Sequence, residues 1–319
     1  MALGLRKAAS KNQLSMQPFW KENPLVPTWV DFITSWWNKY PPRLLNLHVK
    51  KPIYPLPDCI LRKATETDLL SIPEFWNNFY SQSHKTKCYV PLERIKEGVK
   101  DGWDIWVMVH PKSGLIGSLV RRWVKNVHIR QAYFPKIGAI EYFCVHPAWR
   151  KKGVGRRLLW KAQHDTERSI PHFMLWESLQ FTVPPIVTGL YWVKECIQGS
   201  SVLADTKEAS IAWNMCRKNK DIFSEYSPSV ETSVWKTESG YIVTSNTYHR
   251  TIPEGHWIGI LLGQSSEKAL DEFIQQCPFG ILVSDTQRDG WKSDTPFQWI
   301  SYMLNPGFFS TSIPYLCWS

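Results

Sequence analysis

The apolar residues between positions 58 and 180 fall into runs that are typical of strands. Short apolar or alternating runs, bounded by turn-forming residues, predict strands. Such runs occupy residues 60–64, 103–109, 115–123, 137–145 and 171–180. The linker His-Pro-Lys-Ser-Gly between the second and third runs suits a tight turn, so these two runs should form an antiparallel hairpin.

Two segments of the same region have helical spacing instead. Apolar residues three and four positions apart place one face of a helix toward a core. From Leu69 to Phe79 this spacing predicts a helix, in which Pro73 marks a bend or a late start. A second helix should begin near Val154 and carry an apolar stripe formed by Val154, Leu158, Leu159 and Ala162.

The rest of the chain repeats this mixed theme. Residues 240–248, 256–263 and 280–285 predict strands, and residues 265–277 predict a helix capped by Ser265 or Ser266. The double proline at 184–185 should break the chain before a short aromatic helix. The polar interval 199–237 predicts a domain junction, so we expect two α+β halves.

Composition and charge narrow the classes of function. The chain has 319 residues, of which 43% are hydrophobic and 21% charged, as in folded globular proteins. Its net charge of +10 favours an anionic partner: nucleic acid, an anionic membrane surface or a phosphate-rich cofactor. The seven cysteines lack CxxC or zinc spacing, which indicates free thiols in a reducing compartment. We find no secretory signal and no run of about 20 apolar residues, and so expect no transmembrane segment.

The most informative motif is Arg-Lys-Lys-Gly-Val-Gly at residues 150–155, between a predicted strand and a predicted helix. Two glycines let the backbone approach a ligand, and the start of a helix presents free N–H groups to an anion. Nearby Lys and Arg side chains add positive charge, so the segment suits a pyrophosphate. The Walker and dinucleotide-binding patterns are absent. A helix start with a solvated basic face is the alternative interpretation.

The spacing Arg-x-x-Gly-x-Gly after an apolar strand resembles the coenzyme A loop of the GCN5-related N-acyltransferase (GNAT) superfamily. Three further segments resemble one branch of it, the protein N-myristoyltransferases: IEYFCVH at 140–146, PPIVTGLYW at 184–192 and PFWKENPLVP at 18–27. The resemblance covers Phe19 to Trp192. It implies an α+β N-acyltransferase fold, with a mixed central sheet flanked by helices and two pseudosymmetric halves.

Composition and the resemblance together predict a division of the chain into three parts. Residues 1–57, rich in proline and tryptophan, would wrap the surface as extended chain. Residues 58–198 would form the acyl-CoA-binding N-acyltransferase domain. Residues 199–319 would form a shorter C-terminal half that contributes the acceptor site.

Each matched residue receives an implied role. The backbone N–H groups of Tyr142 and Phe143 should form an oxyanion hole for the thioester. The implied cofactor-binding residues are Tyr142, Phe143, Cys144 and Val145 on the strand, Arg150, Lys151, Lys152, Gly153, Val154 and Gly155 around the pyrophosphate, and Phe19, Trp20 and Lys21 as a cover. For each of these side chains, ordinary packing is the alternative.

Two carboxylates compete for the role of proton acceptor. The resemblance implies the α-carboxylate of Ser319, folded into the active site, and the chargeless aromatic tail at 305–319 fits burial. Glu141 is the alternative, because related enzymes often place a glutamate there and burial raises the pKa of a carboxyl group. Ser178 matches a family threonine near the substrate amine, from which it would accept a hydrogen bond; an ordinary strand serine is the alternative.

Other candidates receive structural interpretations. His146 ends a strand, and Cys144 is assigned to packing because direct transfer needs no covalent intermediate. Trp123, Trp149, Trp176 and Trp192 either line an acyl tunnel or belong to an ordinary core.

The sequence therefore predicts transfer of an acyl group, best identified as myristoyl, from acyl-CoA to the N-terminal glycine of a peptide or protein, without a metal. The alternatives are a GNAT acetyltransferase that acts on a small amine or lysine, and a non-catalytic acyl-CoA-binding protein. Motifs for nucleic-acid binding are absent, so we expect no nucleic-acid partner. We further expect a cytoplasmic monomer.

Overall fold

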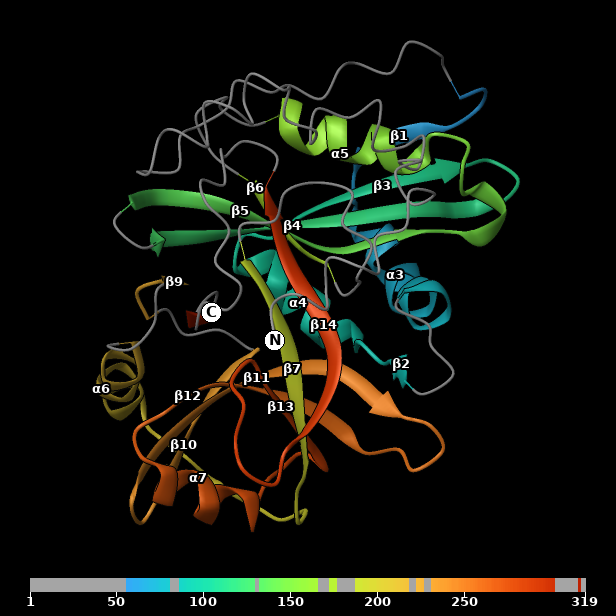
Figure 1. Ribbon diagram of the computed structural model, residues 1–319. Coiled ribbons are helices and arrows are strands. Elements are labelled where there is room, and N and C mark those ends of the chain that lie inside the picture. Colours follow the sequence, from blue (N-terminus) through green and yellow to red (C-terminus); the bar gives the residue numbers. More distant parts are fainter. Residues whose placement is uncertain are drawn as a thin grey trace, which may run out of the picture.

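The computed structural model describes residues 56–80, 86–129, 132–165, 172–176, 187–217, 222–226, 231–301 and 315–316. Within these ranges the strands form one continuous mixed sheet with helices packed on it (Figure 1). The predictions for Phe19, Trp20, Lys21, Ser178 and Ser319 lie outside the described residues.

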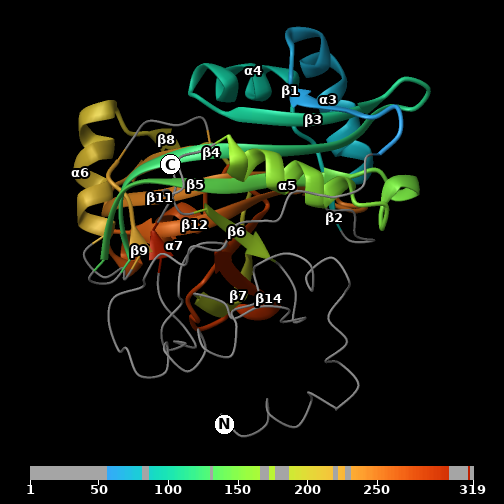
Figure 2. The same cartoon turned by 90° about the horizontal axis from the view of Figure 1, so that it is seen from above.

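In the first half, the strands lie in the order β1 (Ile60–Lys63), β3 (Asp104–His110), β4 (Gly114–Ile129), β5 (Ala132–Val145) and β6 (His172–Trp176). Neighbouring strands are antiparallel except β5 and β6, which are parallel and connected through helix α5 (Val154–His164). Helices α3 (Glu66–Phe79) and α4 (Leu92–Lys100) cover the face opposite α5 (Figures 1 and 2). The short strand β2 (Thr86–Cys88) pairs with the second half.

The second half repeats this order. Its strands are β8 (Val202–Leu203), β10 (Thr232–Thr237), β11 (Gly240–Thr251), β12 (Trp257–Gln264) and β13 (Ile281–Ser284), and the last two are parallel and connected through α7 (Glu267–Ile274). Helix α6 (Thr206–Cys216) packs on Val243 and Leu262, whereas α7 packs on the adjacent Ile242 and Leu261. Adjacent strand residues point to opposite faces, so the two helices cover opposite sides.

Two strands are exchanged between the halves. Strand β7 (Val187–Glu195) follows β6 in the chain but pairs with β13, and β14 (Lys292–Ser301) follows β13 but pairs with β6. β7 and β14 also pair with each other and run between the two halves in Figure 1. The sheet order therefore reads the same from either end, as the predicted pseudosymmetry requires.

Apolar layers cover both faces of the first-half sheet. Helix α5 buries the predicted stripe from Val154 to Ala162 against Ile116 and Leu119. On the other face, α3 buries residues from Leu69 to Trp76. This helix begins at Glu66 and continues through Pro73, so the alternative of a late start is wrong.

The predicted α+β class is confirmed, and so are the predicted strands and helices where the structure describes them, apart from one segment. Of the predicted strand at 171–180, the described part is His172–Trp176. Residues 187–195 form strand β7 and not a short aromatic helix. Val187, Thr188, Tyr191 and Trp192 favour a strand, and β7 has a partner on each edge.

The interval 199–237 is more structured than its polar composition indicates. It contains α6, in which Ala212 and Trp213 are completely buried, and β9 (Ile222–Phe223) and β10. Strand β9 pairs with the end of β4 and, in parallel, with β15 (Tyr315–Leu316). Part of the chargeless tail is therefore docked on the sheet.

Candidate functional site

The first feature of the site is a β-bulge near the end of β5. Ser118 pairs with Cys144 and Val120 with Glu141, so two residues of β5 lie opposite the single Leu119 of β4. These two residues are Tyr142 and Phe143, and Tyr142 has a left-handed φ of 45°. A bulge leaves one residue outside the ladder and re-aims its backbone groups. The residues predicted to supply the oxyanion hole therefore lie at a strand distortion.

The loop after β5 folds back on itself before α5 begins. Pro147–Trp149 form a 3-10 turn, and His146 Nδ1 accepts a hydrogen bond from the N–H of Ala148 at 3.2 Å. Lys151 and Gly153 have φ values of 61° and 81°. This turn leads directly into α5, whose first N–H groups have no partner within the helix and favour an anion.

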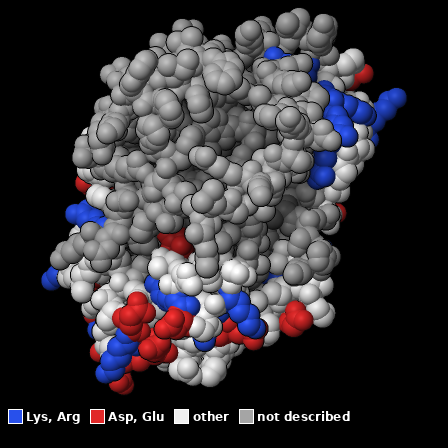
Figure 3. All heavy atoms as spheres, in the orientation of Figure 1, with Lys and Arg blue, Asp and Glu red and all other residues white. Residues whose placement is uncertain are grey.

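Cationic side chains surround this loop. Arg150, Lys151 and Lys152 are exposed. Arg150 Nε donates to the carbonyl of Val145 at 3.1 Å, and Lys152 Nζ lies 4.8 Å from the ring centroid of Trp149. In Figure 3 many of the Lys and Arg atoms gather at the edge where Figure 1 places the β3–β4 hairpin and this loop. The arrangement suits a pyrophosphate.

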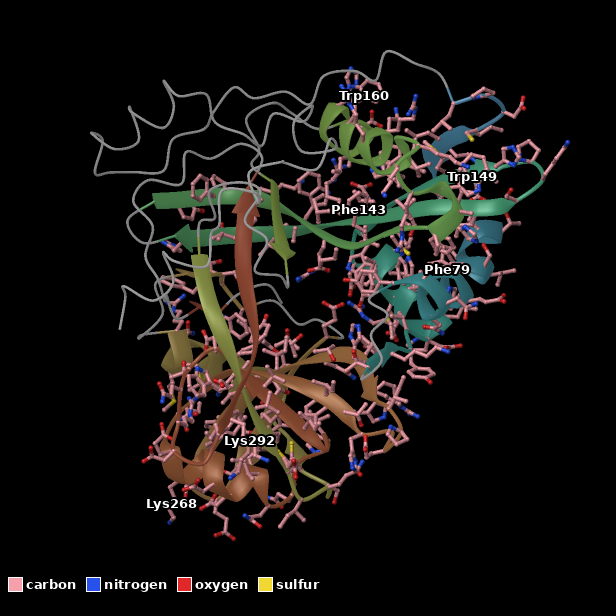
Figure 4. The ribbon with its side chains drawn as sticks, turned by 45° about the vertical axis from the view of Figure 1, so that its right-hand side comes forward. Phe79, Phe143, Trp149, Trp160, Lys268 and Lys292 are labelled. Carbon is pink, nitrogen blue, oxygen red and sulfur yellow. The ribbon has the colours of Figure 1, made fainter. Side chains whose placement is uncertain are left out.

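The side chains beside the bulge pack against the cores of the first half. Phe143 and Val145 contact the apolar layer under α5, and Cys144 is only 3% exposed. Burial raises the pKa of Cys144 to about 12, so its thiol stays protonated at neutral pH. His146 lies against Phe79, with ring centroids 4.5 Å apart, and Figure 4 shows Phe79 and Phe143 on neighbouring elements of this half.

Glu141 lies one residue before the bulge. Arg122 of β4 holds it through two donors, Nη2 at 2.7 Å from Oε1 and Nε at 3.3 Å from Oε2. Burial raises the pKa of Glu141, and the positive charge of Arg122 partly opposes this effect. A carboxyl group with a raised pKa can exchange a proton near neutral pH.

Ionic residues from other elements meet Glu141 and Tyr142, and none of them is among the residues predicted from the sequence. Arg94 of α4 is 3% exposed and forms an ion pair of 2.9 Å with Glu231, which precedes β10. The segment around Arg94 is rich in charged residues and resembles a solvated helix face. A weak signal exists, because Arg94 is adjacent to Ile95 on the side of α4 that is buried.

Tyr248 of β11 was also missed. It has a left-handed φ of 54° at a register shift in the β11–β12 pairing, and it packs in the same core cluster as Tyr142. Tyrosines in this backbone region are uncommon, and strained positions of this kind cluster at functional sites. One distorted tyrosine from each half therefore contributes to the same core.

The described tryptophans among the candidate tunnel residues lie in different places. Trp123 Nε1 donates to Asp104 Oδ2 at 3.2 Å, and the centroid of the Trp123 ring lies 3.9 Å from Lys136 Nζ. Trp149 packs at the outer end of the first half, whereas Trp192 packs on the core of the second half. The side chain of Trp176 lies outside the described residues. Trp149 and Trp192 pack on separate core clusters, as the ordinary-core alternative predicts, whereas Trp123 contacts charged side chains.

Two features are absent from the described ranges. In this part of the chain, no group of three or more His, Cys, Asp or Glu side chains is placed to hold a metal ion. None of the described helices is long and apolar enough to cross a membrane.

Comparison with known proteins gives the site a context. Residues 73–176 match the family model described as Acetyltransferase (GNAT) family. The matched segment runs from the middle of α3 to the end of β6 and includes the bulge and the basic loop. Acyl transfer from an acyl-CoA is the general chemistry that this match indicates.

Solved structures extend the likeness beyond the matched segment. Saccharomyces cerevisiae N-myristoyltransferase with bound myristoyl-CoA superposes with a TM-score of 0.64 at 10% sequence identity, over 90% of this chain and 93% of that chain. A second structure of that enzyme with myristoyl-CoA gives a TM-score of 0.64 at 12% identity, over 94% and 92% of the two chains. The predicted N-myristoyltransferase-like fold is thereby confirmed. No curated protein sequence matches the chain.

Proposed function

We propose that this protein transfers a myristoyl group from myristoyl-CoA to the N-terminal amine of a glycine in a peptide or protein. The observation that carries the proposal is the extent of the structural likeness. The GNAT match covers residues 73–176 alone, whereas the likeness to N-myristoyltransferase includes the second half and covers 90% of the chain. That neighbour holds myristoyl-CoA.

In this proposal the basic loop binds the cofactor. Residues 150–155 hold the pyrophosphate through cationic side chains and through N–H groups at the start of α5. Tyr142, Phe143, Cys144 and Val145 lie beside the thioester arm, and Phe19, Trp20 and Lys21 cover it. Residues 199–319 contribute most of the acceptor site. Ser178 of the first half accepts a hydrogen bond from the amine.

The reaction requires a neutral amine, because an ammonium group has no lone pair. We assign the role of proton acceptor to Glu141, since it lies beside the bulge and burial raises its pKa. The amine nitrogen then forms a bond to the thioester carbon, and the N–H groups of Tyr142 and Phe143 stabilise the oxyanion. The carbon–sulfur bond breaks and coenzyme A leaves. The carboxylate of Ser319 is the competing proton acceptor.

One observation favours a second function, transfer of an acetyl group. The basic loop contains Gly153 and Gly155, as acetyltransferases of this superfamily do, and Gly153 has the positive φ that glycine favours. In that case the acceptor would be a small amine or a lysine.

A coenzyme A release assay separates these functions. Myristoyl-CoA and acetyl-CoA are each supplied with a Gly-starting octapeptide and with an N-terminally blocked peptide that contains lysine. Release with myristoyl-CoA and the glycine peptide alone is the expected result. Turnover of acetyl-CoA alone would reject the myristoyl assignment, and binding of acyl-CoA without release would identify a non-catalytic binder.

A further inference from the structure

Glu231 is an acidic residue of the second half that contacts side chains at the bulge of the first half. Its backbone carbonyl accepts a hydrogen bond from the N–H of Asn246 at 2.9 Å, which fixes it to β11. Its side chain is 9% exposed and lies 2.9 Å from Arg94 and 4.0 Å from Arg122. The hydroxyl of Tyr142 donates to Glu231 Oε1 at 3.5 Å.

Arg122 therefore lies between two carboxylates. It donates to Glu141 at 2.7 Å on one side and faces Glu231 at 4.0 Å on the other. The side chain of Arg122 is 8% exposed and that of Glu141 is 25% exposed. In such a partly buried place, charge–charge interactions are stronger than in water. The positive charge that would stabilise ionised Glu141 is shared with Glu231.

Sharing this arginine has a direct chemical consequence. A carboxylate paired with an arginine of its own has a low pKa and is a weak base. Burial raises the pKa of Glu141, Arg122 lowers it, and the negative charge of Glu231 raises it again. Glu231 thus opposes the loss of basicity that Arg122 would otherwise cause.

The other titratable groups in this cluster do not change the balance at neutral pH. Burial raises the pKa of Tyr142 and Cys88, and it raises the pKa of Tyr248 to about 12, so all three stay neutral. Among the described residues, the charged groups that face Glu141 from β4, α4 and the second half are Arg122, Arg94 and Glu231. With Glu141 itself they form two positive and two negative charges.

We propose that Glu231 is a positioning residue for the transfer reaction: it shares Arg122 with Glu141 and binds Arg94, and so keeps Glu141 basic enough to accept the proton of the acceptor amine. The inference rests on the proposed function, because it needs Glu141 as the proton acceptor. It gives the second half a role in the chemistry in addition to acceptor binding.

The test is Glu231→Gln, which keeps the shape and an oxygen acceptor for Arg94 but removes the negative charge. The titration of the Glu141 carboxyl is followed by ¹³C NMR, assigned with Glu141→Gln, and compared with the pH profile of kcat/KM. Both the titration and the acid limb should move to lower pH by about one unit. The matched control is Glu208→Gln, a carboxylate of the second half paired with Lys236 at 2.5 Å, which should move neither.

Each result decides a separate point. A Glu141 titration that is unchanged in folded Glu231→Gln overturns the inference, as does a fall in kcat/KM of equal size at every pH. A titration that moves without the acid limb places the proton acceptor elsewhere and overturns the role of Glu231 in transfer. If the wild-type protein transfers no acyl group while the titration still moves, the proposed function fails although the charge coupling stands.

A second variant covers the case in which Glu231→Gln does not fold. Glu231→Asp keeps the negative charge but withdraws it from Arg122 by one methylene group. The Glu141 titration should then move in the same direction by a smaller amount. An unchanged titration in this variant would also overturn the inference.

Discussion

Tyr142 stacks on Trp76, with ring centroids 4.3 Å apart and ring planes 10° apart. The indole Nε1 of Trp76 donates to Ser118 Oγ at 2.8 Å, and Ser118 is the β4 partner of Cys144 at one end of the bulge. A single side chain of α3 thus contacts both strands at the distortion. The left-handed backbone at Tyr142 is held by packing from a helix and not by its strand alone.

Substitution of Trp76 should therefore lower the stability of the fold around the bulge. Trp76 is completely buried, and Trp76→Ala should cost about 3 to 5 kcal/mol of unfolding free energy. Trp76→Phe keeps a ring against Tyr142 but leaves the Ser118 hydroxyl without its donor, at a cost of about 1 to 3 kcal/mol. Urea unfolding measures both. Equal stability of Trp76→Phe and the wild-type protein would show that the hydrogen bond contributes nothing.

Lys152 gives the clearest test of the basic loop. It is exposed, and among the described residues its contact is with the ring of Trp149, so its loss should not disturb the fold. We expect Lys152→Ala to weaken coenzyme A binding about three- to tenfold, by the same factor for acetyl-CoA and myristoyl-CoA, because both donors carry the same pyrophosphate. Isothermal titration calorimetry measures the affinities.

The matched control for Lys152 is Lys268, which is 80% exposed on α7 in the second half and lies away from the loop in Figure 4. Lys268→Ala should leave coenzyme A affinity unchanged. If both variants lose affinity equally, the effect reflects overall charge and the loop assignment fails.

Asp68, in the first turn of α3, should make the unfolding free energy of the protein fall at acidic pH. The guanidinium of Arg62 lowers the pKa of Asp68 to about 2, opposed by burial and assisted by the Thr65 N–H at 2.7 Å. Because the folded pKa is below the unfolded value, the stabilisation is present above pH ~4 and is lost as pH falls toward 2. Arg62 is partly exposed, so we expect Asp68→Asn to cost about 1 to 2 kcal/mol at pH 7.

The measurement is the unfolding free energy of both proteins between pH 7 and pH 3. The difference between them should be constant down to about pH 5 and shrink below it. A difference that does not depend on pH would assign the effect to helix capping without the ion pair.

The periodic segments were the predictable part of the fold. The stripe from Val154 to Ala162 repeats at helical spacing, and its burial follows from that pattern alone. Strand β7 was misjudged because the prolines before it indicate a break but do not show what comes next. Its conformation depends on β13 and β14, which are distant in sequence, and no local pattern reports such partners.

The site was predictable where a motif marked it, and hidden where charges meet across the halves. The spacing of residues 150–155 drew attention to the loop, and the bulge lies where the matched motif placed Tyr142 and Phe143. Arg94 and Glu231 are 137 positions apart in the chain and each has polar neighbours in sequence. Their burial is a property of the folded arrangement, so a single sequence offers almost no signal for the pair.

Glu141 and the α-carboxylate of Ser319 can be distinguished as proton acceptors by changing one at a time. Glu141→Gln keeps an oxygen for Arg122 but removes the base, so kcat should fall about 100-fold or more while myristoyl-CoA affinity stays unchanged. The matched change is a short extension after Ser319, which displaces the α-carboxylate without touching Glu141. We expect the extended protein to keep its activity. The opposite result is an extended protein that binds myristoyl-CoA normally but is inactive, together with an active Glu141→Gln. It would identify the carboxylate of Ser319 as the proton acceptor, because the carboxylate of Glu141 would then be dispensable for transfer.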